Sequence, residues 1–564
     1  SVTEVAVSGA DLSNADFGYS FNVIVNENDS GQGSLRQFML NANELANTDL
    51  AQEGHTAGLD TSVFMIPAGQ AGVNGEFTIG PVSALPEVTD PVALDGTTQT
   101  THIGDSNPVG PEIEIEGSSA GAGIYGLHIT AGGSSVRGLA INRFDGDSIF
   151  LQTGGGNTVA GNYIGLNVTG TALDSGNGQS IYLSGSDNNT IGGSTAAERN
   201  VIGDISDQRL AIRDGSDNNV VIGNYIGTDR TGMNALCSGG GIAVGIWDSI
   251  GNRIGGTNPG EGNVLSGNGN RGIFIQNCTD IVIQGNYIGV AADGSTPLGN
   301  GRNGIRLQQG TTGCLIGGDS AAAANIIANN GATDPDPQSG IWVADSGPSL
   351  NNTIVGNSIY NNTPLGINLE GGTEDGNTVT ANDAGDGDAG ANNLLNYPVI
   401  TRADAVTGTV SVDYSLDVPT GDYRIEFFTN PAGASPSGSG EGQNFVDSVN
   451  ISHPGSAQGF SHSFAGSPAD ILTATATECN DATCTDFDAT SEFSAAVLVT
   501  DNGLIAHWPL DESSGTNTDE LVQDNDGTYT NIVTLDQPGA CATTDTAVRF
   551  NGTARSVAVL VRPR

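Results

Sequence analysis

Short patches of alternating apolar and polar residues recur throughout the middle of the chain. Ile273-Phe274-Ile275 is one example, in which every second side chain is aliphatic. An alternation with a period of 2 indicates a strand, whereas an amphipathic helix would show a period near 3.6. Glycine and asparagine separate one patch from the next. Such short strands cannot enclose a core alone, but stacked units can bury one continuous column.

The patches belong to a long repeat. The block Gly161-Asn162-Tyr163-Ile164-Gly165 returns at residues 223–227 and again at 285–289, and both offsets (223 − 161 and 285 − 223) are 62 residues. A fixed period of this size is the signature of a solenoid. Each period contains two sets of three patches, so one coil takes half a period. We therefore predict an all-β chain with a right-handed parallel β-helix over residues 61–398, about ten or eleven coils rising about 4.8 Å each.

The third patch of each coil begins with asparagine. The series is Asn162, Asn200, Asn224, Asn263, Asn286, Asn325 and Asn357. We expect these side chains to point inward at a bend and to hydrogen-bond the equivalent asparagine one coil away, because an unpaired buried amide costs about 1–3 kcal/mol. On this basis Asn263→Leu should be mild as long as its neighbours remain paired, and Asn263→Asp should be worse because it buries a charge.

Insertions alternate between two positions in successive coils. One set follows the third strand of odd coils, at 167–179, 228–240 and 291–303. The other set follows the second strand of even coils, at 194–199, 257–262 and 319–324. The sequence allows two interpretations: two lips that border one strand face, or solvated turns rich in glycine, asparagine, threonine and aspartate.

The charge of the chain is extreme. It has 17 basic and 63 acidic residues, a net charge of −46, and all of the basic residues are arginine. An acidic, lysine-free surface suits salty water or divalent cations and argues against nucleic acid and anionic membranes as partners. An acidic polysaccharide would be repelled unless Ca²⁺ bridged it. No apolar stretch is long enough to span a membrane, and we expect an extracellular or surface location.

The cysteines and one helix-capping motif add detail to this architecture. Cys479 and Cys484 are spaced to close a hairpin as a disulfide, which fits export, and Cys314 is expected to be a structural thiol inside a coil. Residues 1–60 are predicted to be an N-terminal segment with a capping helix, because Ser34 and Gln37 have capping-box spacing before Phe38 and Met39.

One charged cluster within the coils has the composition of a catalytic site. Asp204, Asp207, Arg209 and Arg213 would supply an acid, a base and cations if two carboxylates lay about 5–10 Å apart on one face. The alternative is ordinary surface salt bridging, which the recurrence of polar residues in every coil favours. No serine–histidine–aspartate order, phosphate loop or cofactor fingerprint is present.

A second cluster lies where the coil pattern ends. Asp383, Asp386, Asp388 and Asn392 alternate with glycine and alanine, and such oxygen ligands can wrap a Ca²⁺ ion. The spacing does not match an EF-hand. An acidic exit turn without an ion is the alternative interpretation.

The remaining chain reads as two further β segments. Strands are expected at residues 410–414, 423–428, 445–451, 460–464, 471–476 and 493–499, a spacing typical of an immunoglobulin-like β-sandwich over 399–500. Residues 501–564 begin a third segment with Gly503-Leu504-Ile505-Ala506-His507-Trp508.

The coil motifs resemble those of large bacterial secreted or surface right-handed parallel β-helix repeat proteins. The residues that carry this resemblance are Gly-Asn-Tyr-Ile-Gly at 161–165, Ile-Gly-Gly at 191–193 and Gly-Ser-Leu-Arg-Gln at 33–37. Residues 423–428 and 490–494 resemble the sandwich that follows such helices. Residues 501–564 are similar to an incomplete laminin-G or concanavalin-like lectin domain.

These features leave two functional interpretations. The first is a non-catalytic extracellular structural or adhesive protein, whose partners are surface glycans or copies of itself in a homo-oligomer or filament. The alternative is a polysaccharide-active enzyme, a lyase or glycoside hydrolase, on the same scaffold. We favour the first, because no catalytic set stands out from the repeat.

Overall fold

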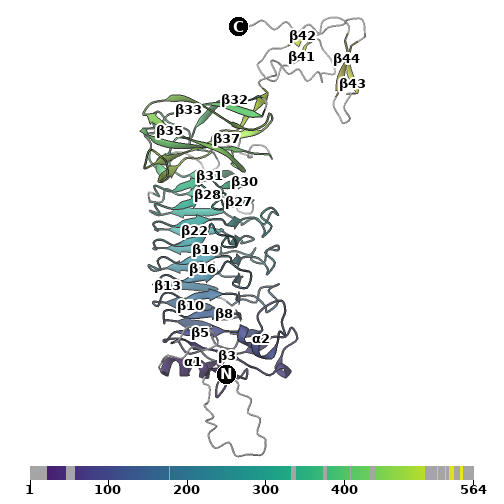
Figure 1. The fold of residues 1–564 in the computed structure, drawn as a ribbon, viewed down its shortest axis with the longest axis vertical. Coiled ribbons are helices and arrows are strands. Elements are labelled where there is room, and N and C mark those ends of the chain that lie inside the picture. Colours follow the sequence, from purple (N-terminus) through teal and green to yellow (C-terminus); the bar gives the residue numbers. More distant parts are fainter. Residues whose placement is uncertain are drawn as a thin grey trace, which may run out of the picture. The chain divides into compact units, whose positions relative to one another are not determined.

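The computed structural model describes residues 22–45, 58–176, 178–331, 338–347, 349–372, 378–406, 408–431 and 440–501, together with four short strands beyond them. Nearly all of its regular structure is β (Figure 1). Through the middle of the chain each coil contributes one strand to each of three parallel sheets, which we call the first, second and third sheets.

The three sheets follow the three patches of the repeat. The first sheet contains β7 (Leu127–Ile129), β10 (Ile149–Gln152), β13 (Ile181–Ser184), β16 (Gln208–Arg213), β19 (Ile242–Trp247), β22 (Ile273–Gln276), β25 (Ile305–Gln308), β28 (Ser339–Val343) and β31 (Leu365–Leu369). The second contains β2 (Asp60–Thr61), β5 (Val92–Asp95), β8 (Ser135–Arg137), β11 (Thr158–Ala160), β14 (Thr190–Gly192), β17 (Val220–Ile222), β20 (Arg253–Gly255), β23 (Val282–Gln284), β26 (Leu315–Gly317) and β29 (Thr353–Val355). The third contains β4 (Phe77–Ile79), β6 (Ile113–Glu116), β9 (Leu139–Asn142), β12 (Tyr163–Ile164), β15 (Val201–Ile202), β18 (Tyr225–Ile226), β21 (Val264–Leu265), β24 (Tyr287–Ile288), β27 (Ile326–Ala328) and β30 (Ser358–Tyr360).

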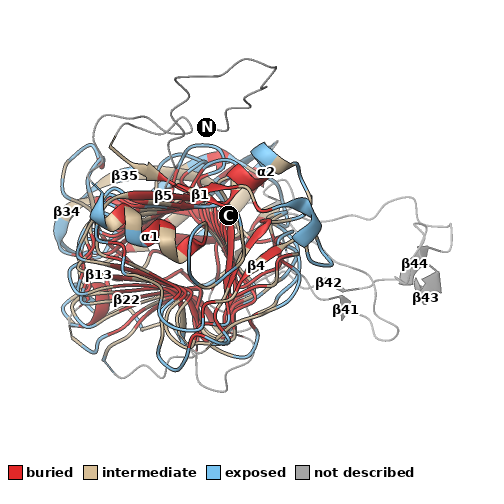
Figure 2. Cartoon of the chain, turned by 90° about the horizontal axis from the view of Figure 1, so that it is seen from below, coloured by how far each residue is buried: buried red, intermediate tan, exposed pale blue. Residues whose placement is uncertain are grey.

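The core is a column of aliphatic side chains stacked coil on coil. Ile149 pairs with Ile181, which pairs with Leu210, and all three are fully buried. Seen along the column, the buried residues lie on the strands and the exposed ones on the loops (Figure 2). Each such side chain contributes about 1.5–3 kcal/mol by leaving water. The predicted parallel β-helix is therefore confirmed, and the ten strands in each of two sheets match the expected number of coils.

The predicted asparagine ladder is present at the bend between the second and third sheets. The Nδ2 of Asn162 donates to Oδ1 of Asn200 at 3.1 Å, and Asn200 donates to Asn224 at 2.9 Å. The same oxygens also accept the backbone N–H of the preceding asparagine, as in Asn162 N to Asn200 Oδ1 at 3.0 Å. The ladder continues through Asn263, Asn286 and Asn325 to Asn357.

Two further ladders occupy the other bends. Between the first and second sheets, bonds run from Asn157 through Asn189 and Asn219 to Asn252, and a later pair joins Asn352 to Asn392. Cys314 stands within this row as a buried thiol, as expected, and its backbone N–H donates to Asn352 Oδ1 at 3.2 Å. Between the third and first sheets a third ladder links Asn268, Asn300, Asn330 and Asn362. All three bends thus satisfy buried backbone groups with amide side chains.

Helices close the N-terminal end of the column. The predicted capping helix is α1 (Leu35–Glu44), in which Ser34 Oγ accepts the N–H of Gln37 at 3.2 Å and Phe38 and Met39 are buried. A second helix, α2 (Thr97–Ile103), was not predicted, because its sequence is polar and lacks apolar periodicity. Its Gln99 accepts the N–H of Ile66 at 2.8 Å, so it also caps backbone groups. In the described part of the chain, neither helix has the length and apolarity needed to cross a membrane.

The short remaining elements near this end are β1 (Val23–Ile24), which pairs with β3 (Val63–Phe64), and the 3₁₀ turn η1 (Ala68–Gln70). A second 3₁₀ turn, η2 (Ala391–Leu394), follows the last coil.

Antiparallel strands follow the β-helix and fit a β-sandwich. One sheet contains β32 (Val399–Val406), β33 (Thr409–Leu416), β36 (Gln458–Ala465) and β40 (Thr500–Asp501). The other contains β34 (Thr420–Thr429), β35 (Asn444–Pro454), β37 (Ile471–Cys479), β38 (Phe487–Thr490) and β39 (Val497–Leu498). The expected strand at 493–499 is reduced to β39, and β32 and β38 were not predicted. The disulfide between Cys479 and Cys484 is confirmed, with an S–S distance of 2.07 Å.

The lectin-like segment at 501–564 lies mostly outside the described residues. Four strands are placed there: β41 (Asn517–Thr518) with β42 (Gly527–Thr528), and β43 (Val533–Pro538) with β44 (Thr546–Phe550). By contacts the chain divides into two compact units, one comprising residues 1–400, 414–460 and 471–496 and the other 401–413, 461–470 and 497–564. The segment boundaries drawn from the sequence at 60, 398 and 500 remain predictions.

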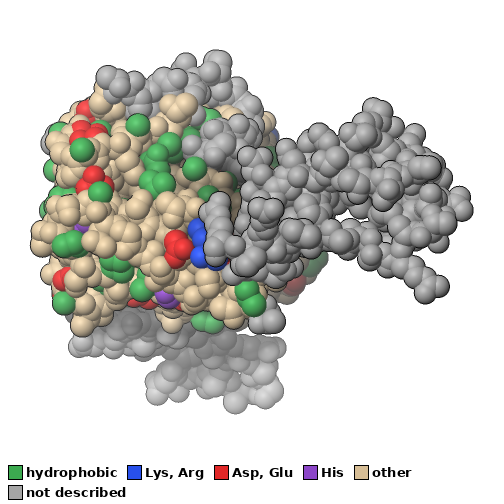
Figure 3. All heavy atoms as spheres, turned by 90° about the horizontal axis from the view of Figure 1, so that it is seen from above, with side chains coloured by type: hydrophobic (Ala, Val, Ile, Leu, Met, Phe, Trp, Pro, Cys, Tyr) green, Lys and Arg blue, Asp and Glu red, His purple; other side chains and the backbone are tan. Residues whose placement is uncertain are grey.

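Acidic side chains do not form one continuous patch on the end of the molecule that Figure 3 shows. Acidic side chains lie there in isolated groups separated by uncharged side chains and backbone. The separation of the carboxylates on this face limits repulsion between neighbours.

Three buried glutamates from the following strands and loops cap the last coils. The Glu441 carboxylate accepts the N–H groups of Asn361 at 2.6 Å and Asn362 at 2.9 Å, and so ends the third ladder. Glu426 accepts the N–H of Gly356 at 2.9 Å. Glu492 accepts N–H groups of the last coil in the same way, including that of Leu369 at 3.0 Å. These carboxylates satisfy donors that an uncovered β-helix end would expose.

The ladder geometry predicts the effect of changing Asn263. Its Oδ1 accepts from N and Nδ2 of Asn224, and its Nδ2 donates to Val221 O and Asn286 Oδ1. The neighbours therefore do not remain paired in Asn263→Leu, and we expect a loss of about 3 kcal/mol or more in unfolding free energy. Chemical denaturation measures it, with the exposed Asn28→Leu as control.

At neutral pH the Asn263→Asp variant should lose more unfolding free energy than Asn263→Leu. Asn263→Asp still accepts from Asn224, but it buries a charge beside the oxygen of Asn286. Protonation restores a donor, so its deficit relative to the native chain should shrink as pH falls. A deficit that stays constant between neutral and acidic pH would contradict this account.

The glutamate cap predicts a pH dependence of stability. Burial raises the pKa of Glu441 to about 7, despite the hydrogen bonds from Asn361 and Asn362 that favour its ionised form. Because the folded chain keeps this proton when the unfolded chain has lost it, stability should fall by up to about 3 kcal/mol as pH rises from about 4.5 to 7. Glu441→Gln should remove this component of the pH profile. Thermal melts across that range measure it, and an unchanged profile in the variant would contradict the assignment.

Candidate functional site

The loop insertions border the third sheet on both sides. The odd-coil insertions fold as hairpin-like loops, with bridges between Leu166 and Leu173 and between Val290 and Pro297. The even-coil insertions precede the third strand and form the opposite wall. Residues between the walls occupy equivalent positions on successive strands: Tyr163, Val201, Tyr225, Val264, Tyr287 and Ile326. Val201 and Val264 are buried, and the others are partly exposed. Of the two interpretations of the insertions, the arrangement as two lips about one strand face is the one that the structure favours.

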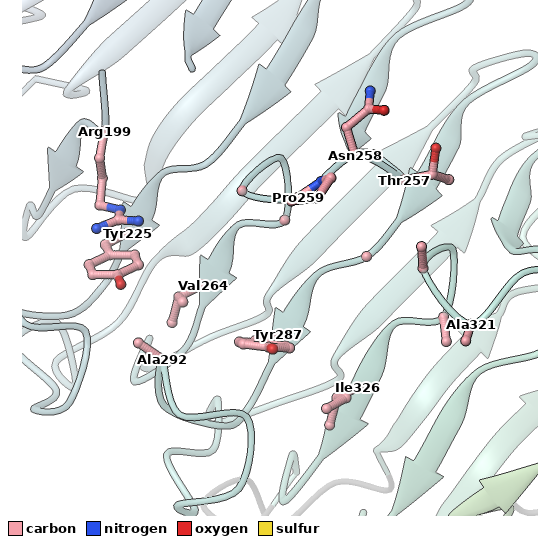
Figure 4. A pocket seen from close by; sticks show the side chains of 16 residues that line it. Arg199, Tyr225, Thr257, Asn258, Pro259, Val264, Tyr287, Ala292, Ala321 and Ile326 are labelled. Carbon is pink, nitrogen blue, oxygen red and sulfur yellow. The ribbon is translucent and has the colours of Figure 1, made fainter. Parts of the chain in front are cut away.

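A hollow of about 550 Å³ lies between these lips. Figure 4 shows Tyr225, Val264, Tyr287 and Ile326 in a row across its floor. Residues of the even-coil loops stand along one side and Ala292 of an odd-coil loop along the other. We call this feature the groove. Its floor is apolar and aromatic, and its rim is made of small and polar residues.

Internal hydrogen bonds hold the lips in shape. Burial raises the pKa of Asp229, but hydrogen bonds from Asn234 and Thr231 outweigh it and hold that pKa below its usual value. Hydrogen bonds from Thr296 and Ser295 lower the pKa of Asp293 to about 2. These carboxylates stay ionised and tie their own loops.

The tyrosines of the floor also support the lips. A Cβ atom on Gly232 would lie 2.8 Å from Cε2 of Tyr225, and one on Gly294 would lie 3.2 Å from Cζ of Tyr287. Both glycines have φ near +70°, a conformation that other residues rarely adopt. Each odd-coil loop therefore rests against a tyrosine ring, so the groove is built by the coils themselves rather than by mobile side chains.

The residues that line the groove are mostly small, aromatic or uncharged. Arg199 is its charged side chain; the guanidinium lies 4.1 Å from the centroid of Tyr225, and Nε donates to Gly223 O at 3.2 Å. Among the lining residues, all within the described part of the chain, there is no carboxylate, histidine or cysteine. The side chains of the lining that can take part in proton transfer are the phenols of Tyr225 and Tyr287, since tyrosine can act as a general acid or base.

The alternative catalytic cluster is split between the interior and the surface. Asp204 is 2% exposed and its Oδ1 accepts the N–H of Ile205 at 2.6 Å. Burial raises the pKa of Asp204 to about 6. Arg209 is 1% exposed and donates to the backbone oxygens of Asp204 at 2.9 Å and Cys237 at 3.2 Å. Neither side chain can reach a bound polymer.

The other two members of the cluster point outward. Asp207 is exposed, and the Arg213 guanidinium lies 3.8 Å from the Trp247 ring centroid. The structure therefore does not bring Asp204, Asp207, Arg209 and Arg213 into one accessible site. Within the described residues no ion pair involves Arg209 or Arg213, although, against the burial that raises the pKa of Asp204, the charge of Arg209 acts to lower it.

The expected calcium ligands are also divided between the surface and the interior. Carboxylate oxygens of Asp383, Asp386 and Asp388 lie within 4.8 Å of one another. Burial, with the nearby carboxylates of Glu478, Asp388 and Asp383, raises the pKa of Asp386 to about 7 against the opposing hydrogen bond from Asn396. Asn392 is fully buried in the second ladder, where Nδ2 donates to Asn352 O at 2.7 Å and to Thr490 O. Asn392 is thus a structural residue, and three carboxylates remain as candidate ligands.

The groove residues were not singled out from the sequence. Tyr225, Val264 and Tyr287 occupy the variable place in the Asn-x-apolar motif, and the recurring tyrosine suggested only the repeat. Their outward position, directly after an inward asparagine, is the signal that could have identified a floor.

Comparisons with known proteins agree on the type of fold only. No protein-family model matches the sequence, and no curated protein matches it. The A-module of mannuronan C-5 epimerase AlgE4 from Azotobacter vinelandii is a similar solved structure, with 16% identity, a TM-score of 0.36, and coverage of 62% of this chain and 89% of that one. Dettilon tailspike protein gp208 has 12% identity, a TM-score of 0.30, and coverage of 79% and 92%. At these values the similarities carry no argument about function.

We still predict that Ca²⁺ stabilises the chain by binding to Asp383, Asp386 and Asp388. An ion bound only by the folded state at a hundred times its dissociation constant would add about 2.7 kcal/mol. We expect the thermal midpoint to rise with Ca²⁺ and fall with chelator at low salt. Asp386→Asn should abolish this response, while the exposed Asp105→Asn should keep it. Equal midpoints with Ca²⁺ and chelator in the native chain would rule out the site.

Proposed function

We propose that this chain is a non-catalytic extracellular scaffold that binds an extended, neutral glycan in the groove over the third sheet. The observation that carries the proposal is a preformed groove with an aromatic and aliphatic floor and no carboxylate, histidine or cysteine among its described lining residues. Ligand sites of this kind are concave, largely apolar and edged by a few polar groups.

The periodicity of the floor supports a polymer rather than a compact ligand. Successive coils rise by about 4.8 Å, which is close to the length of one pyranose unit in an extended chain. The apolar faces of sugar rings can pack on Tyr225 and Tyr287, while hydroxyl groups meet Thr257, Asn258 and the backbone of the lips. Tyrosine is well suited to this role because it presents a flat apolar ring with a polar end.

The charge of the site favours an uncharged polymer. Arg199 is stacked on Tyr225 and already donates a hydrogen bond, so the groove offers few free cationic contacts. The net charge of −46 would repel an acidic chain that lacks specific cationic partners.

Several sequence features support an extracellular setting. A disulfide persists in oxidising compartments, and the lysine-free acidic composition suits a saline exterior. The resemblance of the coils to bacterial surface proteins points in the same direction. Self-association remains a prediction, and the enzymatic alternative is disfavoured by the burial of Asp204 and Arg209.

Blocking the groove tests this function. Ala322 is exposed on an even-coil lip and lines the groove, so Ala322→Trp should fill it without disturbing the coil. Ala197→Trp, at the equivalent place of an earlier loop outside the lining set, is the matched control. With calorimetry on cello-, xylo-, manno- and laminari-oligosaccharides, we expect at least one to bind, and Ala322→Trp alone to weaken it by about tenfold or more.

The same samples distinguish binding from catalysis. Chromatography after prolonged incubation should recover every oligosaccharide intact. Reproducible cleavage would support the enzymatic alternative. Binding that survives Ala322→Trp, or no binding by any of the neutral probes, would refute the groove as a glycan site.

A further inference from the structure

A second surface runs along the outside of the first sheet. Five consecutive strands, β16, β19, β22, β25 and β28, present arginine or an aromatic residue on their outer side: Arg213, Trp247, Phe274, Arg306 and Trp342. We call this set the arginine–aromatic face. It lies on a different sheet from the groove.

The side chains of this face contact one another. The Arg213 guanidinium is 3.8 Å from the Trp247 ring centroid, and that of Arg306 is 4.7 Å from the Trp342 centroid. Trp247 and Phe274 have centroids 5.3 Å apart. Gly245 makes room for this arrangement, because a Cβ there would lie 2.2 Å from the Trp247 ring. Both tryptophans and both arginines remain partly exposed.

The two arginines of this face have no carboxylate partner. Within the described residues no ion pair involves Arg213 or Arg306. The same is true of Arg199, whereas Arg36 and Arg143 each have at least one. The Nε atoms of Arg213 and Arg306 are buried without a hydrogen-bond partner among these residues. Both arginines are partly exposed, so an acceptor from outside the chain can approach their terminal nitrogens.

The carboxylates near the face are already engaged. Glu370 accepts from Trp342 Nε1 at 3.2 Å, and Asp214 accepts from Ser184 Oγ at 2.7 Å. These acids lie towards the C-terminal ends of the strands, beyond the row of arginines and rings. The centre of the face therefore combines apolar rings with two arginines that have no ion pair. Arg213 still donates to Gln208 Oε1 at 3.3 Å, and burial lowers the pKa of Arg306 against the opposing charge of Glu370.

We propose that the arginine–aromatic face binds an acidic polysaccharide, independently of the groove. Arginine pairs well with carboxylate and sulfate oxygens through its fork of donors, so Arg213 and Arg306 would hold two anionic groups of the chain. Trp247 and Trp342 would carry the sugar rings. The two arginines are three coils apart, roughly 14 Å at about 4.8 Å per coil, a span that fits a polymer and not a single anion.

The overall charge does not prevent such binding at physiological salt. The Debye length is about 8 Å at 0.15 M, so a ligand on this face is influenced mainly by the nearest arginines. Nucleic acid also stacks on aromatic side chains, but its affinity depends on many more phosphate contacts than two arginines provide. An acidic glycan is therefore the better match.

A comparison of charged and neutral forms of one glycan tests the proposal. We expect an oligogalacturonate to bind the full chain at 0.15 M salt and its fully methyl-esterified form to bind at least about tenfold more weakly. Dextran sulfate, in a parallel arm, shows whether sulfate serves as well as carboxylate. Equal binding of the charged and esterified forms, or no binding of either acidic polymer, would overturn the proposal.

Variants then locate the site. Arg213→Gln with Arg306→Gln should weaken oligogalacturonate binding by about tenfold or more, whereas the double lysine variant, which keeps both charges, should retain part of it. Arg137→Gln, an exposed arginine of the second sheet, is the control for lost charge. Unchanged affinity in the double glutamine variant, or tighter binding of single-stranded DNA than of oligogalacturonate, would refute the assignment.

The test of acidic glycan binding at this face is distinguishable from the test of neutral glycan binding in the groove. Ala322→Trp should leave oligogalacturonate binding unchanged, and the arginine variants should leave neutral oligosaccharide binding unchanged. If either set of variants abolished both activities, the two surfaces would not be independent and this proposal would fail.

Discussion

The structure depends on how a β-helix satisfies the backbone at its bends. Each bend turns N–H and C=O groups towards an interior without water, where an unpaired group is costly. Asparagine solves this problem because one amide side chain both donates and accepts. Asn162 and its counterparts bond the backbone of their own bend and the side chain one coil away, so every coil depends on its neighbours. Where the column ends, Glu441 replaces the missing asparagine.

This constraint explains why so few conspicuous residues are functional. Asn392 has a side-chain oxygen that could bind a metal ion, but it is the last asparagine of the second ladder. Asp229 and Asp293 resemble reactive carboxylates but tie their own loops. What is left for function lies on the outer side of the strands, where side chains are not needed by the bends. Both proposed surfaces are of this kind, and both follow the column because the repeat places equivalent positions in register.

Much of the fold could be predicted from the sequence because it is periodic. The inward asparagines at 162–357 followed from the spacing of the patches, whereas the spacing of the insertions allowed either two lips or solvated turns. The third ladder, from Asn268 to Asn362, was missed because the insertion at 291–303 changes the spacing of its members: Asn268 follows Asn263 by 5 residues (268 − 263), but Asn300 follows Asn286 by 14 (300 − 286). Helix α2 was missed because its role is polar capping by Thr98 and Gln99 rather than apolar packing.

The candidate sites were harder to predict, because a linear pattern does not say which side chains reach solvent. Arg209 and Arg213 lie on the same strand, each two residues from Ala211. Arg209 is buried among neighbouring loops, whereas Arg213 lies over the ring of Trp247. Likewise, Tyr225 and Tyr287 belong to a motif whose recurrence suggested structure alone. They do support the loops, and the same contacts shape the groove.

The most direct test of this account is an experimental structure of the chain with a neutral oligosaccharide that it binds. The account predicts an intact oligosaccharide along the third sheet, packed on Tyr225 and Tyr287 between the two rows of loops. A cleaved product, or a ligand held elsewhere while the groove stays empty, would contradict it.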